Sequence, residues 1–340
     1  MKRILLMVVM FVLLVAPLSA QETDLDAVKV YLTGKVDELN TASADLVEGV
    51  EAYYTLAEAV DFDYEALWTD NRVDVIAALT IAKEAWLVAS PLYEQVEGIV
   101  AGVPSLSEFD VILDAGGAGD VPFDLVISEE RTFTSPGNLF GILEATLWGT
   151  VPEYSSGMTA DLNLNSEADF GETLPDAEVL NVAGQTFNTY VADLVVSADA
   201  WTPTNEDAFT ALVVMVPTMS EYFGSWRDSR FVLGEASTQT DFTVISRLSD
   251  INDILGGLLV VYDGVQPLIT AADSAQADQI RSDLVSLQAY VNDLFAQEQD
   301  GRQFTPEEAD IFGTEAQDRA QAITGQIAQV AALVGVELAE

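Results

Sequence analysis

The sequence predicts an all-α fold, and three observations support this prediction. Apolar residues recur at helical spacing along most of the chain. Several of these segments begin with residue types that cap helices. Finally, 49% of the 340 residues are hydrophobic and 9% are aromatic, which is enough for a large core despite the formal net charge of −43.

The predicted helices follow one another with short breaks. In chain order they span residues 24–40, 43–60, 72–101, 137–148, 176–200, 205–232, 241–269, 274–299 and 306–335. The last has the clearest start, because Thr305 can cap it, Pro306 suits its first turn and Glu308 completes a capping box. The helices that begin near 176 and 205 carry acidic residues at the positive end of the helix dipole.

Two long stretches interrupt this pattern. Residues 102–136 include a glycine-rich turn at 116–119, followed by the apolar run 123–127, which fits either a short strand or an extended loop. Residues 150–175 are rich in Ser, Asn, Asp, Thr and Gly, and we expect them to form a long irregular loop.

A weak internal repeat relates two of the helical segments. Five residues within a window of about 22 recur at an offset of 169 residues. They stand at positions 75, 76, 79, 93 and 96. Two similar bundles in tandem would explain the match, and so would chance similarity between two amphipathic helices.

The N-terminus is typical of a secretory signal peptide over residues 1–20. Two basic residues precede an apolar run from Ile4 to Val15, and the segment ends at the small residue Ala20. A retained membrane anchor is the alternative, but the run is short for a span. No cysteine follows, which excludes a lipoprotein anchor. We therefore expect a secreted, periplasmic or cell-surface protein without a membrane span after cleavage.

The composition excludes several classes of function. The chain has no histidine and no cysteine, so it cannot form disulfides, Cys/His zinc sites, or Ser-His-Asp and Cys-His catalytic groups. Thirteen basic residues against 56 acidic ones argue against nucleic acid as a partner, because phosphate contacts require Lys and Arg. A bound metal ion, such as iron or calcium, would need oxygen ligands.

The segment 139–149 places a single carboxylate, Glu144, inside an apolar helix. This segment resembles the GxHxxE motif and the following Leu-Trp-Gly of imelysin-like proteins, the family of insulin-cleaving membrane proteases and iron-uptake proteins. Glu144 matches the motif glutamate and Trp148 the tryptophan. Gly141 stands at the position of the histidine and Leu139 at that of the first glycine.

Further segments resemble the same family in order and spacing, so that the likeness covers roughly residues 70–338. They are residues 86–97, 228–231, 250–264 and 333–338. The resemblance implies two helical-bundle-like halves, which we place at 21–200 and 201–340 after the signal peptide, with a site between them. It also implies a location in the cell envelope.

The resemblance leads to a functional hypothesis. We expect an exported binding or accessory protein of the envelope, linked to metal (iron) uptake, whose partner is a small ligand or an envelope protein. Peptidase activity is not expected, because Gly141 cannot replace the motif histidine. Two alternatives remain: an acidic extracellular protein for adhesion or surface assembly, and a hydrolase that uses only carboxylates.

The candidate ligand-binding residues are Glu144, Trp148, Arg230, Asp250 and Tyr262, with Glu144 as the metal ligand if a metal binds. Arg230 is expected to approach Glu144 and supply the charge that the missing histidine would carry. Ordinary surface pairing of Arg230 with Asp228 or Glu235 is the alternative. For Tyr262, core packing is the alternative.

Overall fold

The structure is a computed structural model that describes residues 23–167 and 169–339; the predicted signal peptide at 1–20 lies outside them. Helices dominate the described chain, which confirms the all-α prediction. The helices are α1 (Leu25–Glu58), α2 (Tyr64–Val100), α3 (Ser107–Asp110), α4 (Leu139–Trp148), α5 (Ala177–Ala200), α6 (Asn205–Met215), α7 (Met219–Asp228), α8 (Arg230–Leu233), α9 (Arg247–Ala272), α10 (Ser274–Gln299) and α11 (Pro306–Leu333).

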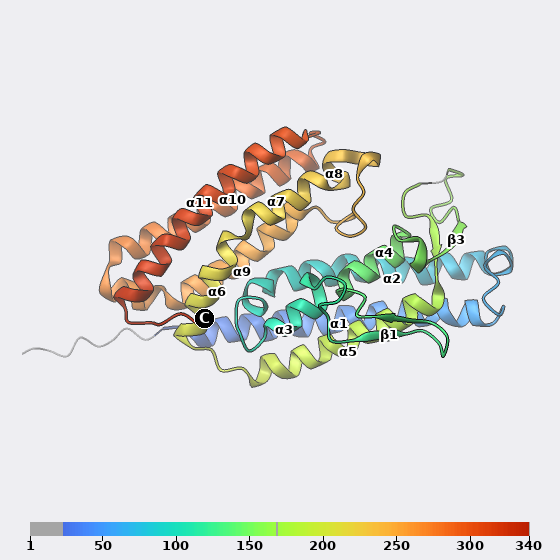
Figure 1. The fold of residues 1–340 in the computed structure, drawn as a ribbon, viewed down its shortest axis with the longest axis horizontal. Helices are drawn as coiled ribbons and strands as arrows, with labels where there is room; N and C mark the ends of the chain where they lie inside the picture. Colours follow the sequence, from blue (N-terminus) through green and yellow to red (C-terminus); the bar gives the residue numbers. More distant parts are fainter. Residues whose placement is uncertain (1–22, 168, 340) are drawn as a thin grey trace, which may run out of the picture.

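Figure 1 shows the long helices in two groups. Helices α1, α2, α4 and α5 pack on one another, and α6, α7, α9, α10 and α11 form the second group. Helix α2 packs against α9, which joins the groups. Glycine makes the closest approaches possible: a Cβ on Gly49 would lie 2.5 Å from the Ala82 backbone nitrogen, and one on Gly257 would lie 2.3 Å from the Gln95 carbonyl oxygen.

The N-terminal helices are longer than the sequence indicated. The two helices expected at 24–40 and 43–60 are one helix, α1, because Ala42 and Ser43 continue its buried face. Helix α2 begins at Tyr64 instead of residue 72, since the Asp63 carboxylate caps it by accepting bonds from two backbone N–H groups. Asn71 has non-helical angles inside α2 (φ −123°, ψ 17°), so the helix bends there and continues.

The helix expected at 205–232 is broken twice. Pro217 ends α6 in a short 3₁₀ turn (Val216–Thr218), because proline lacks a backbone N–H and clashes with the preceding turn. Ser229 is extended and separates α7 from the single turn of α8. The next helix, α9, begins at Arg247 instead of 241, with the Ser246 hydroxyl as its cap.

Both irregular stretches contain regular structure. Residues 102–136 fold into α3, a π-helical turn (Val111–Ala115) and an antiparallel hairpin of β1 (Asp124–Val126) and β2 (Thr132–Thr134). The 123–127 run is thus a strand. Residues 150–175 hold a second antiparallel hairpin, β3 (Ser155–Thr159) and β4 (Thr173–Pro175), and the described parts of its connection, 160–167 and 169–172, are irregular.

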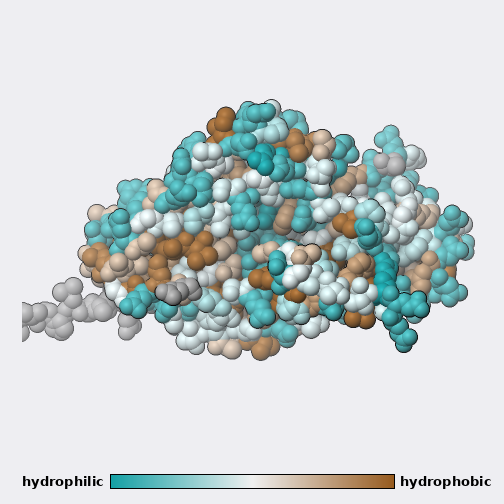
Figure 2. Space-filling model, viewed as in Figure 1, coloured by the Kyte–Doolittle hydropathy of each residue, from teal (hydrophilic) through white to brown (hydrophobic). Residues whose placement is uncertain are grey.

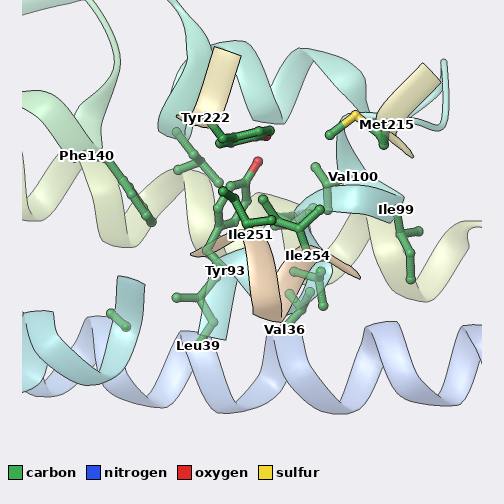
Figure 3. Packing of buried hydrophobic residues seen from close by; sticks show 14 of the residues in the cluster. Val36, Leu39, Tyr93, Ile99, Val100, Phe140, Met215, Tyr222, Ile251 and Ile254 are labelled. Atoms are coloured by element: carbon green, nitrogen blue, oxygen red, sulfur yellow. The ribbon is translucent and has the colours of Figure 1, made fainter. Parts of the chain in front are cut away.

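Helices α2 and α9 form the apolar centre. By length and hydropathy both would suit a membrane span, yet 44% and 50% of their most apolar windows are buried inside the protein. Figure 3 shows how this centre is packed by residues of α1, α2 and α9, namely Val36, Leu39, Tyr93, Ile99, Val100, Ile251 and Ile254. Hydrophilic residues cover much of the face drawn in Figure 2, with apolar patches between them.

Candidate functional site

Six carboxylic side chains are buried where α2, α3, α4 and α9 meet. They are Glu94, Glu97, Asp110, Asp114, Glu144 and Asp250, none of them more than 9% exposed. Helical spacing pairs several of them: Glu94 and Glu97 share one face of α2 at i, i+3. Among the described residues Arg247 is the only buried basic side chain, so negative groups far outnumber positive ones here.

Arg247 neutralises part of this charge. Its Nη1 lies 2.9 Å from Asp250 Oδ2 and 3.7 Å from Glu94 Oε1. The guanidinium carbon also lies 3.6 Å from the ring centre of Phe242 and 4.7 Å from that of Tyr222. This combination of charge pairing and stacking on aromatic rings is how a guanidinium is held away from water.

Two tyrosines bind other members of the group. Tyr93 donates its hydroxyl to Asp110 Oδ1 at 2.8 Å, and Tyr222 donates to Glu97 Oε1. Both tyrosines are labelled in Figure 3, among the buried hydrophobic residues of the core. Each hydroxyl satisfies only one carboxylate oxygen.

Several carboxylate oxygens have no hydrogen-bond partner. They are both oxygens of Glu94, Oε2 of Glu97 and Oδ1 of Asp114, all shielded from solvent. One ligand atom from each of these three residues lies within 4.8 Å of the others. An unpaired buried charge is costly, so these oxygens require protons or a cation. A set of oxygens alone suits hard cations such as calcium, and not the soft metals that prefer sulfur.

A cavity of about 430 Å³ opens beside this group. Its lining includes Glu97, Asp110, Asp114, Tyr222 and Arg247, together with Asp241. A second hollow of about 220 Å³ shares Asp241 and reaches Gly141. The carboxylates are therefore buried but lie next to space that a solute can enter.

Glu144 is held by one residue of the loop before α9. Its Oε1 accepts bonds from the backbone N–H and, at 2.8 Å, from the hydroxyl of Thr243. These bonds favour the charged form, but burial outweighs them and raises the pKa of Glu144 to about 7. Burial likewise raises the pKa of Asp110 to about 7 and that of Asp250 to about 6.

We expect the cation-free protein to lose stability between pH 5 and pH 8. In this window the native state keeps protons on Glu144 and Asp110 that the unfolded chain has already released, so stability falls as pH rises. A rise in pKa from 4.5 to about 7 corresponds to roughly 3 kcal/mol for Glu144 alone. Urea unfolding in the presence of a chelator, at pH 5 and at pH 8, measures this loss as a difference in the free energy of unfolding. Molar salt should reduce only the part of this loss of stability that comes from repulsion between surface charges. If molar salt abolished the loss, the buried carboxyls could not be its cause.

Thr243→Val should cost about 1–3 kcal/mol, because it removes the hydroxyl that a buried carboxylate accepts. Thr189→Val is the matched control: its hydroxyl bonds a carbonyl of its own helix on the exposed side of α5. Urea unfolding of the control should change by less than about 0.5 kcal/mol. Equal losses in the two variants would show that Thr243 has no special role.

The predicted ion pair between Glu144 and Arg230 is wrong. Arg230 Nη2 lies 2.6 Å from Glu235 Oε1, and its guanidinium carbon lies 3.7 Å from the ring centre of Phe170. The alternative of pairing with Glu235 is what the structure shows. The extended Ser229 starts the separate turn α8 there, and Arg247 instead is the arginine buried among the carboxylates.

The other predicted residues separate into two groups. Glu144 and Asp250 lie in the buried carboxylate group. Trp148 is half-buried at the end of α4, 5.3 Å from the Lys83 ammonium, and packs on Gly171. Tyr262 is fully buried and donates its hydroxyl to the Ala277 carbonyl at 2.7 Å, which ties α9 to α10 and agrees with core packing.

The buried residues that were not predicted from the sequence as site residues are Glu94, Glu97, Asp110, Asp114 and Arg247. Their signal was present, because acids at i, i+3 and at i, i+4 stand inside apolar segments at 94–97 and 110–114. The same signal singled out Glu144. The sequence pattern does not show that these segments pack around one arginine, Arg247.

The sequence and the structure were compared with known protein families, proteins and solved structures. The family model of imelysin (peptidase M75) matches residues 27–334. A crystal structure of an imelysin-like protein from Psychrobacter arcticum 273-4 is 16% identical, covers 95% of this chain and 100% of its own, and superposes with a TM-score of 0.43. No protein of curated function matches the sequence significantly. Because the family model spans nearly the whole described chain, the protein belongs to the imelysin family.

Proposed function

We propose that this imelysin-family member is an exported binding protein of the cell envelope that holds a hard cation with Glu94, Glu97 and Asp114. The observation that carries the proposal is the set of buried oxygens on these three residues that accept no hydrogen bond, although Arg247 Nη1 lies 3.7 Å from one of them, Glu94 Oε1. Five further groups of the site (Asp110, Glu144, Asp250, Tyr93 and Tyr222) already have a donor or acceptor partner. The unpaired oxygens are thus the ones left for a ligand.

The donor set favours calcium, magnesium or ferric iron over zinc. Zinc sites usually include nitrogen or sulfur ligands, and this chain has no histidine and no cysteine. The motif histidine of the family is Gly141 here, so nothing at that position can bind a metal. An accessory role in iron uptake would use the cavity beside Asp114 as the route of entry.

Peptidase activity is not part of the proposal. Glu144, the motif glutamate, accepts two bonds from Thr243 and lies in a helix whose residue three positions earlier has no side chain. Digestion of insulin or casein by the purified protein, with and without added calcium or zinc, should yield no cleavage. Cleavage abolished by Glu144→Gln would contradict this part.

Calorimetric titration tests the cation site. Calcium chloride and ferric citrate are titrated in turn into the chelator-treated protein, into Glu94→Gln, and into Glu84→Gln. Glu84 is the matched control, since it stands on the same helix with its side chain exposed. We expect Glu94→Gln to lose one binding event that Glu84→Gln keeps. Identical isotherms for the two variants with both metals would overturn the site.

A further inference from the structure

The connection between β3 and β4 carries a second ligand pattern, remote from the buried carboxylates. Over twelve residues, acidic or amide side chains stand at positions 1, 3, 5, 9 and 12, namely Asp161, Asn163, Asn165, Asp169 and Glu172. This is the spacing of the calcium loop of EF-hand proteins, in which position 7 contributes a backbone carbonyl and position 12 a glutamate that binds through both oxygens.

The side chains of this loop converge. Asp169 Oδ2 lies 3.0 Å from Asn163 Nδ2 and 2.6 Å from Asn165 Nδ2. Rotation of either amide by half a turn presents its oxygen at the same place, in exchange for the bond that this oxygen accepts from the backbone N–H of Asn165 or Glu167. Three potential ligands from positions 3, 5 and 9 are therefore already gathered at one point.

Glu172 closes the loop at position 12. It is 5% exposed, and its two oxygens accept bonds from the backbone N–H groups of Asn163 and Asp169, at 3.0 and 2.9 Å. A carboxylate has about four acceptor sites, so Glu172 keeps capacity for a cation after these two bonds. A glutamate is thus fixed on the inner side of an otherwise exposed loop.

Position 1 holds an unsatisfied oxygen. Asp161 Oδ2 accepts a bond from the Ser166 backbone N–H at 3.1 Å and lies 3.4 Å from Arg72 Nη2, whereas Asp161 Oδ1 is shielded from solvent and has no partner. A buried carboxylate oxygen without a donor is the mark of a missing ligand or proton. Arg72 pairs with the other oxygen of this carboxylate, and because its side chain is 43% exposed it compensates the charge weakly.

The turn at position 6 also fits. Calcium loops have glycine there because the chain turns sharply. Ser166 has φ +71°, a conformation that a non-glycine residue rarely adopts. The backbone therefore takes the shape of the loop despite the serine.

We propose that residues 161–172 bind one calcium ion through Asp161, Asn163, Asn165, the Glu167 carbonyl, Asp169 and Glu172. Strands β3 and β4 flank the loop in place of the helices of an EF-hand. Phe170, within the loop, lies against Arg230 of α8, and the Gly171 carbonyl accepts a bond from Lys83 of α2 at 2.7 Å. By fixing this loop, calcium would also fix its contacts with α8 and α2.

Terbium luminescence tests the proposal, because terbium replaces calcium and Trp148 packs on Gly171, close enough to sensitise it. We expect emission that rises with terbium and is displaced by calcium. Glu172→Gln and Asp161→Asn should each weaken the apparent affinity, by roughly tenfold or more given the carboxylate count on which such sites depend. Glu167→Gln is the matched control: it has the same charge change in the same loop, on an exposed side chain that binds only through its backbone.

The variants also separate this site from the proposed cation site of α2. Glu94→Gln should keep the terbium signal, and loss of that signal in Glu94→Gln alone would overturn the loop site. Equal affinities for Glu172→Gln and Glu167→Gln would overturn it as well. If circular dichroism shows that Glu172→Gln is unfolded, Asn165→Ala, at an exposed ligand position, takes its place with the same expected loss.

Discussion

Replacing Arg247 with methionine should destabilise the protein by about 3–5 kcal/mol, the usual cost of removing one partner of a buried ion pair. Methionine has a similar length but leaves Asp250 and Glu94 without their cation in a site that excludes water. Asp250, whose pKa is about 6 beside Arg247, would then have to be protonated near neutral pH as well. Urea unfolding at pH 7 measures the loss, which should shrink as the pH falls toward 5.

Arg281→Met is the matched control for this substitution. Arg281 pairs with Asp263 at 2.8 Å, a distance close to that of the Arg247–Asp250 pair, but both side chains are more than 40% exposed. Its loss should cost less than about 1 kcal/mol. Arg247→Lys should fall between the two, because it restores the charge but not the stacking on Phe242. Equal losses for Arg247→Met and Arg281→Met would refute the buried pair as a stabilising element.

Glu94→Gln should have the opposite effect in the absence of cations: it should stabilise the protein by about 1–3 kcal/mol at pH 8. Burial and the nearby Asp250 hold the pKa of Glu94 well above its ordinary value. The unfolded chain releases this proton freely at pH 8, so the wild-type native state is penalised. Glutamine has nearly the same shape and no proton to lose.

The stabilisation by Glu94→Gln should vanish at pH 4, where Glu94 is protonated in both native and unfolded states to a large degree. Chemical unfolding in chelator at the two pH values provides the measurement, with Glu84→Gln as the exposed control on α2. A Glu94→Gln protein that is less stable than wild type at pH 8 would mean that the charge of Glu94 is compensated within the chain.

Much of the helical fold could be predicted from the sequence, because apolar spacing and caps are local features. The errors lie where local signals are ambiguous. Nothing between residues 40 and 43 ends a helix, so α1 is continuous, whereas Pro217 breaks a segment whose apolar pattern continues on both sides. The capping box at Thr305 is confirmed, because the side chains of Thr305 and Glu308 each accept a bond from the backbone N–H of the other, three residues away in the sequence.

The candidate site was harder to predict, because it depends on packing between segments that are far apart in the sequence, such as those around Glu94 and Asp250. Glu144 stood out as a charge in an apolar helix, and the structure does bury it. The choice between Arg230 and Arg247 could not be made from spacing: it depends on where α9 begins and on which of its faces meets α2. Arg247 is the first residue of that helix, next to the Ser246 cap, and its side chain is buried.

The loop at 160–172 shows a different limit. Its composition predicts only a polar loop, and this is correct for most of its residues, which are exposed. The spacing of its acidic and amide residues carries the chemical information. Position 6 is Ser166 and not glycine, so a strict calcium-loop pattern does not match. Ser166 nevertheless adopts the positive φ that favours glycine at this position.

The most direct test of the cation site is the thermal unfolding midpoint of two proteins at pH 8, both carrying Glu172→Gln to silence the loop: one with Glu94 intact and one with Glu94→Gln. In chelator, the protein with Glu94→Gln should melt higher. With calcium or ferric citrate at about 100 times the dissociation constant, the protein with Glu94 intact should gain about 2.7 kcal/mol and the other should gain nothing. Equal shifts in both proteins, for each metal, would contradict a cation bound by Glu94, Glu97 and Asp114.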